Sequence, residues 1–163
     1  MKGLRGLALG GLLVLSTAAA AGGVPVTLLD GKPSTFADQI KGGHWTVVMM
    51  WTTYCNFCRK QYPLVSAFHD AHKGKDAEVL GVSLDGPAAL DAVREYVAQA
   101  PFSFPTVVGD PDVMARMFET ATEESFTGTP TYMVFNPARQ LVAIKSGLIS
   151  AETLDSYLDK KAP

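Results

Sequence analysis

Apolar runs alternate with amphipathic stretches along most of the chain. Apolar runs of strand length, bounded by turn residues, occur at 24–29, 45–51, 78–84, 106–108, 131–135 and 141–145. Between and beside them, helical apolar spacing or helix-start residues predict helices at about 34–40, 56–72, 87–99, 110–118 and 151–160. Strands that alternate with helices predict an α/β sandwich with a mostly parallel central sheet.

Three segments carry the strongest patterns. The run at 45–51 is nearly continuous apolar, as expected for a strand buried on both faces. The residues between the last two strands, at 136–139, include Asn136-Pro137 and indicate an antiparallel hairpin at the C-terminal edge of the sheet. The helix at 56–72 has four apolar side chains that suit one buried face: Phe57, Leu64, Val65 and Phe68.

The N-terminus has the pattern of a secretory signal. Lys2 and Arg5 precede an apolar run at 7–15, and small residues at 16–21 contain A-x-A cleavage sites. We therefore expect residues 1–21 to be a cleaved signal peptide and residues 22–163 to form one domain. An uncleaved anchor is the alternative, although the apolar run is short for a span of ~20 residues.

Composition narrows the class of protein further. With 47% apolar and 18% charged residues, the chain of 163 residues is long enough to form one core and is not largely disordered. The 14 basic residues balance 16 acidic residues and form no basic block, so no nucleic-acid partner is expected. Export would expose the mature protein to an oxidising compartment, which we expect to be the periplasm.

The two cysteines of the chain, Cys55 and Cys58, lie between the buried strand and the following helix. Unpaired backbone N–H groups at a helix N-terminus stabilise an anion, so a thiolate there has a pKa below the free value of ~8.5. Cys55 at the edge is the better placed nucleophile. Cys58, one turn further, should be more buried and able to resolve a mixed disulfide.

Two other interpretations of the pair are less favourable. A static disulfide with this spacing closes a very short loop and constrains the unfolded chain little. A zinc site would need His69 and His72, but a helix that carries Cys58 and His69 separates them by ~16 Å at 1.5 Å per residue. Zinc ligands converge on one ion, so no metal is expected.

The segment from Trp51 to Pro63 resembles the active-site segment of TlpA-like proteins, the branch of the thioredoxin superfamily that includes ResA and CcmG. The likeness spans most of residues 26–160. It continues in the family's order at 79–85, 104–105, 109–111 and 128–136. The resemblance implies a thioredoxin-like three-layer α/β fold, a thiol–disulfide oxidoreductase without cofactor, and a monomer that acts on protein thiols and disulfides.

The resemblance also implies roles for individual residues. Cys55 would attack and Cys58 would resolve. Pro130 matches the family's cis-proline, and with Thr129 it would pair with an extended substrate strand beside the reactive sulfur. The remaining candidates are an apolar surround of the site, Trp51 and Tyr54, and a possible acid/base, Asp85.

Departures from the family leave the direction of electron flow open. Asn56 and Phe57 replace the Pro-Pro pair common in this branch, and Met49 stands where thioredoxin has a buried acid. The favoured hypothesis is a periplasmic reductase that a membrane-embedded thiol donor reduces again. A disulfide donor or isomerase is the main alternative. A thiol peroxidase is another, because residues 52–55 match T-x-x-C, and a binding module without activity is a fourth.

Overall fold

The computed structural model describes residues 23–100 and 102–158. The strands are β1 (Pro25–Leu28), β2 (Pro33–Thr35), β3 (Trp45–Trp51), β4 (Ala77–Ser83), β5 (Thr106–Gly109), β6 (Thr131–Phe135) and β7 (Leu141–Ser146). The helices are α1 (Phe36–Gln39), α2 (Asn56–His72), α3 (Leu90–Gln99), α4 (Pro111–Thr122) and α5 (Ala151–Leu158), and the 3₁₀ turn η1 (Pro87–Ala89) leads into α3. The predicted signal peptide at 1–21 and the last two residues of the predicted final helix, 159–160, lie outside the described residues.

All seven strands form one sheet in the order β2-β1-β5-β4-β3-β6-β7. Only the neighbours β3–β4 and β4–β5 are parallel among the described strands, and the other four pairs are antiparallel. The α/β thioredoxin-like class and the antiparallel C-terminal hairpin are confirmed, with the correction that the sheet is mixed. A strand that helices cover on both faces is a continuous apolar run whether it lies parallel or antiparallel to its neighbours. The sequence pattern therefore did not distinguish a mostly parallel sheet from a mixed one.

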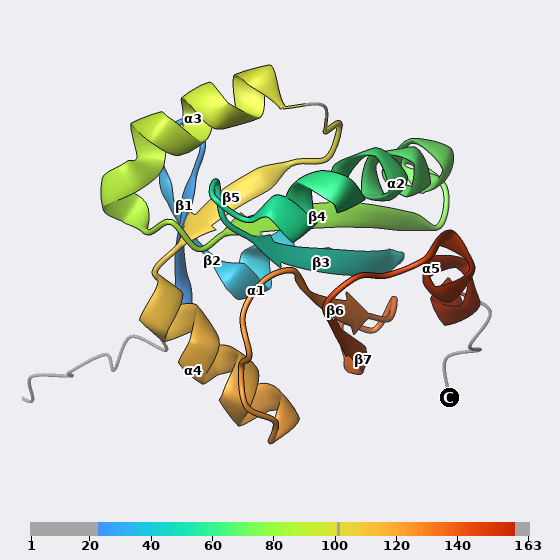
Figure 1. Cartoon of the computed structure of the whole chain (residues 1–163). Helices are drawn as coiled ribbons and strands as arrows, with labels where there is room; N and C mark the ends of the chain where they lie inside the picture. The colour runs from blue at the N-terminus through green and yellow to red at the C-terminus, as the bar shows by residue number, and fades with distance from the viewer. Residues whose placement is uncertain (1–22, 101, 159–163) are drawn as a thin grey trace, which may run out of the picture.

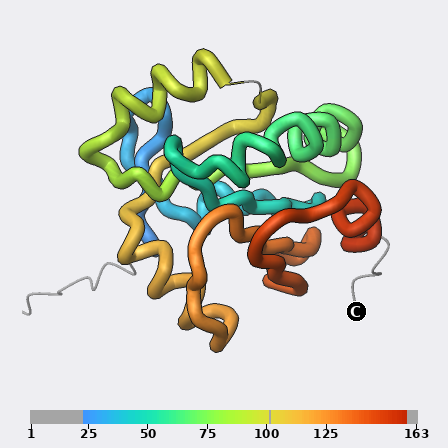
Figure 2. The backbone as a smooth tube through the Cα atoms, viewed as in Figure 1, coloured from blue at the N-terminus to red at the C-terminus, as the bar shows by residue number. Residues whose placement is uncertain are grey.

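Helices cover both faces of the sheet and make three layers (Figures 1 and 2). Buried side chains of α2, α3 and α5 form one core cluster with the sheet, and those of α1 and α4 form a second cluster on the other side. We call these the disulfide face and the opposite face. Helix α5 contacts α2 on the disulfide face.

Strand β3 joins the two clusters at the centre of the sheet. All seven of its residues are buried, which confirms the prediction of a strand covered on both sides. Val47 and Met49 point to the disulfide face, whereas Val48 and Met50 point to the opposite face. By the same alternation, the last residue of the strand, Trp51, points to the disulfide face. Helix α2 starts five residues later and packs on that face.

Some element boundaries differ from those that the sequence predicts. Strand β2 was not expected, and Thr35 rather than Ser34 caps α1 by accepting a hydrogen bond from the Asp38 N–H at 3.2 Å. Helix α4 extends to Thr122 instead of ending near Phe118. Its start is as predicted, since Asp110 caps it by accepting two backbone hydrogen bonds.

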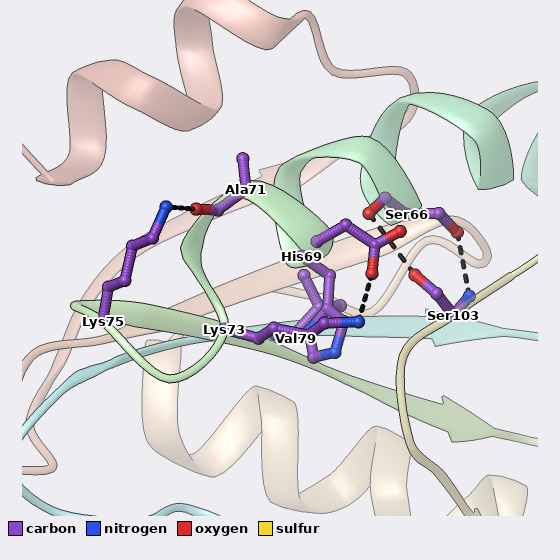
Figure 3. A network of polar contacts seen from close by, with 8 residues as sticks. Ser66, His69, Ala71, Lys73, Lys75, Val79 and Ser103 are labelled. Atoms are coloured by element: carbon purple, nitrogen blue, oxygen red, sulfur yellow. Dashed lines mark hydrogen bonds and ion pairs between the residues drawn. The ribbon is translucent and has the colours of Figure 1, made fainter.

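The two histidines considered for zinc have local partners. His69 is buried between α2 and β4, and its Nδ1 accepts a hydrogen bond from the Val79 N–H at 3.0 Å (Figure 3). His72 pairs with Asp76 at 2.8 Å on the surface. Within 23–100 and 102–158, no three His, Cys, Asp or Glu side chains gather as metal ligands would. No helix in these ranges is both long and apolar enough to cross a bilayer.

Candidate active site

The two cysteines form a disulfide at the N-terminus of α2. Cys55 and Cys58 have Cα atoms 5.2 Å apart and are bonded through Sγ. Cys55 is the N-cap of the helix, and its Sγ accepts a hydrogen bond from the Cys58 N–H at 3.1 Å. The sulfur therefore lies where the helix presents unpaired N–H groups, as the sequence predicted. In the reduced protein the same N–H would stabilise a Cys55 thiolate.

The two sulfur-bearing residues differ in exposure. Cys55 retains 8% of its surface and Cys58 none. Both belong to the core cluster of the disulfide face, but only Cys55 reaches solvent. This difference in exposure is the one expected if Cys55 is the accessible attacking thiol and Cys58 the buried resolving thiol.

The loop before β6 faces the disulfide. The peptide bond between Thr129 and Pro130 is cis, as the resemblance implied. The Thr129 carbonyl oxygen lies 3.5 Å from Cys55 Sγ. A disulfide sulfur carries no proton, so this approach is a contact rather than a hydrogen bond. The Pro130 carbonyl accepts from the Gly147 N–H at 2.8 Å, which anchors the loop to the end of β7.

Asp85 organises the loop that leads into Cys55. Its carboxylate accepts hydrogen bonds from the Thr53 N–H at 3.0 Å and from the Thr53 hydroxyl at 2.7 Å. It also accepts from the Ser83 hydroxyl at 2.7 Å. Asp85 is half-buried and lies two residues after the end of β4, so it ties the end of β4 to the turn that follows the neighbouring strand β3. This geometry supports a positioning role, because the carboxylate is already occupied by the loop.

The aromatic residues near the disulfide fall into two groups. Trp51 is fully buried and packs against Tyr62 and Tyr96 with ring centroids 5.9 and 5.5 Å apart, so it is part of the core beneath the cysteines. Tyr54 is 76% exposed and Phe57 is 58% exposed. The prediction that Phe57 lies on the buried face of its helix is wrong. The first turn of α2 buries Cys58 and leaves Phe57 at the edge of the buried face, where Lys60 covers the Phe57 ring from 5.5 Å.

One buried side chain close to the pair was missed. Gln61, one turn after Cys58, is 6% exposed, and its Oε1 accepts hydrogen bonds from Tyr132 Oη at 3.1 Å and from the Ile149 N–H at 2.7 Å. It joins α2 to β6 and to the segment before α5. The sequence did contain a signal: an uncharged amide, Gln61, lies on the apolar face of α2. A polar group at a buried position needs hydrogen-bond partners, so it could have been singled out.

Comparison with known proteins places this arrangement in a family. The model of the AhpC/TSA family matches residues 19–144. The chain belongs to the AhpC/TSA family. Curated relatives include sporulation thiol-disulfide oxidoreductase A of Bacillus subtilis, 23% identical over 119 residues that cover 72% of this chain and 68% of the relative. Thiol-disulfide oxidoreductase ResA of Bacillus cereus is 28% identical over 138 residues, or 85% of this chain and 74% of that protein.

Solved structures that are similar to this chain show the same fold. StoA of Bacillus subtilis superposes with a TM-score of 0.62 at 20% identity, covering 82% of this chain and 93% of that one. A thiol:disulfide interchange protein of Chlorobium tepidum gives 0.66 at 21% identity, covering 84% and 93%. The resemblance to ResA-related proteins is thereby confirmed. The enzyme class that the sequence predicted, a thiol–disulfide oxidoreductase with a C-x-x-C pair, agrees with these relatives and with the Cys55–Cys58 disulfide.

Proposed function

We propose that this protein reduces disulfides of exported proteins in the periplasm. In the reduced enzyme, the Cys55 thiolate attacks one sulfur of a substrate disulfide, which forms a mixed disulfide and releases the other substrate sulfur as a thiolate that takes up a proton. Cys58 then loses its proton and attacks Cys55 Sγ. The second substrate thiol leaves, and the two electrons that the substrate gains come from forming the Cys55–Cys58 disulfide.

The observation that carries this proposal is the environment of Cys55 Sγ. The sulfur accepts from the Cys58 N–H at 3.1 Å, and the Thr129 carbonyl approaches it to 3.5 Å. The first contact favours the thiolate, and the second places a strand-like backbone beside it. An extended substrate segment can pair with that backbone while its sulfur meets Cys55. Thr129 and Pro130 are therefore the proposed substrate-binding residues.

The oxidised pair must be reduced again for a further cycle. We propose that a membrane-embedded thiol donor performs this step and that residues 1–21 direct the protein to the periplasm, either as a cleaved signal or as an anchor. An oxidising compartment does not itself supply thiols, which is why a dedicated donor is required. Fractionation of cells and N-terminal sequencing of the exported form test the location and the cleavage.

The redox potential of the Cys55–Cys58 pair tests the direction. Equilibration with glutathione should give a value near ~−270 mV, as for thioredoxin, whereas a value near ~−120 mV would make the protein a disulfide donor and overturn the proposal. Reduction of a disulfide-bonded test protein should vanish in Cys55→Ser. Cys58→Ser should instead accumulate the mixed disulfide. Rapid peroxide consumption that survives Cys58→Ser would favour a thiol peroxidase.

A further inference from the structure

Thr53, in the loop that leads into Cys55, is held from two sides. Its N–H and its hydroxyl both donate to the Asp85 carboxylate, at 3.0 and 2.7 Å. Its carbonyl oxygen accepts from Nη2 of Arg59 at 3.1 Å. Each polar group of Thr53 therefore has a charged partner, and hydrogen bonds to charged groups are stronger than neutral ones. These contacts fix residues 52–55, which we call the Cys55 loop.

Both partners of Thr53 are themselves anchored. Arg59 lies near the start of α2, and its Nε donates to Tyr96 Oη of α3 at 3.2 Å. Asp85 lies after β4 and accepts from the Ser83 hydroxyl at 2.7 Å. The guanidinium is therefore directed at the Cys55 loop from the helices, and the carboxylate is directed at it from the sheet. A side chain that is already ordered loses less conformational entropy when it holds a further group.

The contacts of Thr53 matter most after the disulfide opens. In the oxidised protein, the covalent bond to Cys58 holds Cys55 Sγ 3.1 Å from the Cys58 backbone nitrogen. Reduction removes this restraint, and the position of Cys55 then depends on the backbone on either side of it. On the C-terminal side the helix holds it, since the Arg59 N–H donates to the Cys55 carbonyl at 3.2 Å. On the N-terminal side it depends on the Cys55 loop, which Thr53 anchors.

We propose that Arg59 and Asp85 act together, through Thr53, as positioning residues for Cys55 in the reduced enzyme. They hold the Cys55 loop so that the sulfur stays beside the Cys58 N–H, which stabilises the thiolate. Neither side chain touches the substrate or transfers a proton in this role. The role rests on the proposed exchange activity, because it concerns the same thiolate, and it extends the site to a residue of α2 beyond the two cysteines.

Loosening the Cys55 loop should change two properties of the cysteine pair. The Cys55 thiolate loses part of its stabilisation, so the thiol should ionise at higher pH. Stabilisation of the thiolate favours the reduced form, so its loss should make the redox potential more negative. Both properties are measured on folded protein, and a substitution that only lowers the free energy of unfolding leaves them where they are.

A matched pair of variants at Thr53 tests the role without changing any charge. Thr53→Val keeps the branched shape but loses the hydroxyl that donates to Asp85, whereas Thr53→Ser keeps the hydroxyl. In a Cys58→Ser background, the ultraviolet absorbance of the thiolate follows the ionisation of Cys55 alone. The acid dissociation constant of Cys55 should fall about threefold in Thr53→Val, as expected for one lost hydrogen bond, and should match the parent in Thr53→Ser.

Arg59→Gln tests the other side of the Cys55 loop. The glutamine side chain ends two atoms sooner and cannot reach the Thr53 carbonyl, so the dissociation constant of Cys55 should fall about threefold to tenfold. Lys60→Gln is the matched control, since it removes the same charge from a neighbouring side chain that covers Phe57 instead. Its effect should be smaller. In the protein with both cysteines, the glutathione equilibrium should shift toward the disulfide in Thr53→Val and Arg59→Gln by factors similar to those of the ionisation.

An unchanged ionisation of Cys55 in Thr53→Val would overturn the proposal, as would equal shifts in Thr53→Val and Thr53→Ser. A shift in Lys60→Gln as large as that in Arg59→Gln would also overturn it, because charge alone would then account for the effect of Arg59. Circular dichroism of each variant checks that the fold is kept. These measurements use no protein substrate, so their failure would leave disulfide reduction untouched, and failure of disulfide reduction would leave the measured shifts standing.

Discussion

The two faces of the central sheet differ in the chemistry of their buried side chains. The opposite face buries mainly aliphatic, methionine and phenylalanine side chains, together with Thr46 and Thr131, which strand alternation places on this side. The disulfide face contains both cysteines and also buries the polar side chains of Gln61, Tyr62, His69 and Tyr132. Gln61 and His69 each need a hydrogen-bond partner in a fixed place, so this face is specified by polar contacts as well as by volume. The opposite face is specified mainly by volume.

This difference implies that changes on the opposite face affect stability alone. Changes on the disulfide face should affect both stability and the properties of the site. Four measurements test the distinction, and they run from the largest expected effect to the smallest.

Phe118→Ala removes a large side chain from the opposite face. Phe118 is 1% exposed and packs edge-on against Phe126 with ring centroids 5.6 Å apart. The cavity left behind should cost about 3–5 kcal/mol of the free energy of unfolding, measured by urea denaturation. The redox potential of the cysteine pair, measured on the folded variant, should not move. A shifted potential would show that the two faces are coupled.

Gln61→Leu tests the polar brace of the disulfide face. The substitution leaves the Tyr132 hydroxyl and the Ile149 N–H without their acceptor, which should cost about 1–3 kcal/mol in denaturation experiments. The Ile149 amide should also exchange with solvent faster than in the parent protein. Unchanged stability together with unchanged exchange would mean that Gln61 only fills space.

Mild acid should lower the free energy of unfolding, because it protonates His69 on the disulfide face. Burial is the main cause that lowers the pKa of His69, and its Nδ1 must stay unprotonated to accept from the Val79 N–H. The unfolded chain then binds the proton more readily than the folded one. The contribution is fully present above the unfolded pKa of ~6.5 and is lost as pH falls below it through the folded value.

Urea denaturation at neutral and mildly acidic pH measures this dependence. His69→Asn keeps an acceptor near Val79 but cannot titrate, so its free energy of unfolding should fall less over the same range. If the parent protein and the variant lose stability equally, other groups cause the acid sensitivity.

The smallest effect is expected from a pair of tyrosine variants. Tyr62→Phe removes a buried hydroxyl whose polar neighbour is the Tyr96 phenol, so the loss of stability should stay below about 1 kcal/mol. Tyr132→Phe removes a hydroxyl that donates to Gln61 and should cost about 1 kcal/mol. A larger loss in Tyr62→Phe than in Tyr132→Phe would show that the contact between Tyr62 and Tyr96 stabilises this face more than the hydrogen bond from Tyr132 to Gln61 does.

The sequence accurately predicted the strand and the helix that carry the cysteine pair. The strand at Trp45–Trp51 and the helix at Asn56–His72 have the predicted bounds, because an apolar run and a helical apolar face are local patterns. The spacing of Cys55 and Cys58 across a helix start was sufficient to predict a switchable disulfide and the more exposed sulfur.

Phe57 shows where a periodic pattern fails. It shares a helix face with Leu64 and Phe68, and burial along that face increases from 58% exposed at Phe57 to 7% at Phe68. Helical periodicity gives the direction of a side chain but not how far the neighbouring sheet extends beneath it. In the first turn of α2 the core covers Cys58 but not Phe57, so the Phe57 ring remains at the surface next to the disulfide.

The sequence by itself determined the class of fold, the reactive pair and its orientation, because these depend on residues close together in the chain. Apart from Thr129 and Pro130, which the family resemblance placed beside the sulfur, only the tertiary structure decided which distant groups meet around the pair. Thr129 reaches Cys55 across 74 residues, and Gln61 meets Ile149 across 88. Such contacts depend on the strand order and on the directions of β3 and β6, which long-range packing sets and local spacing does not encode.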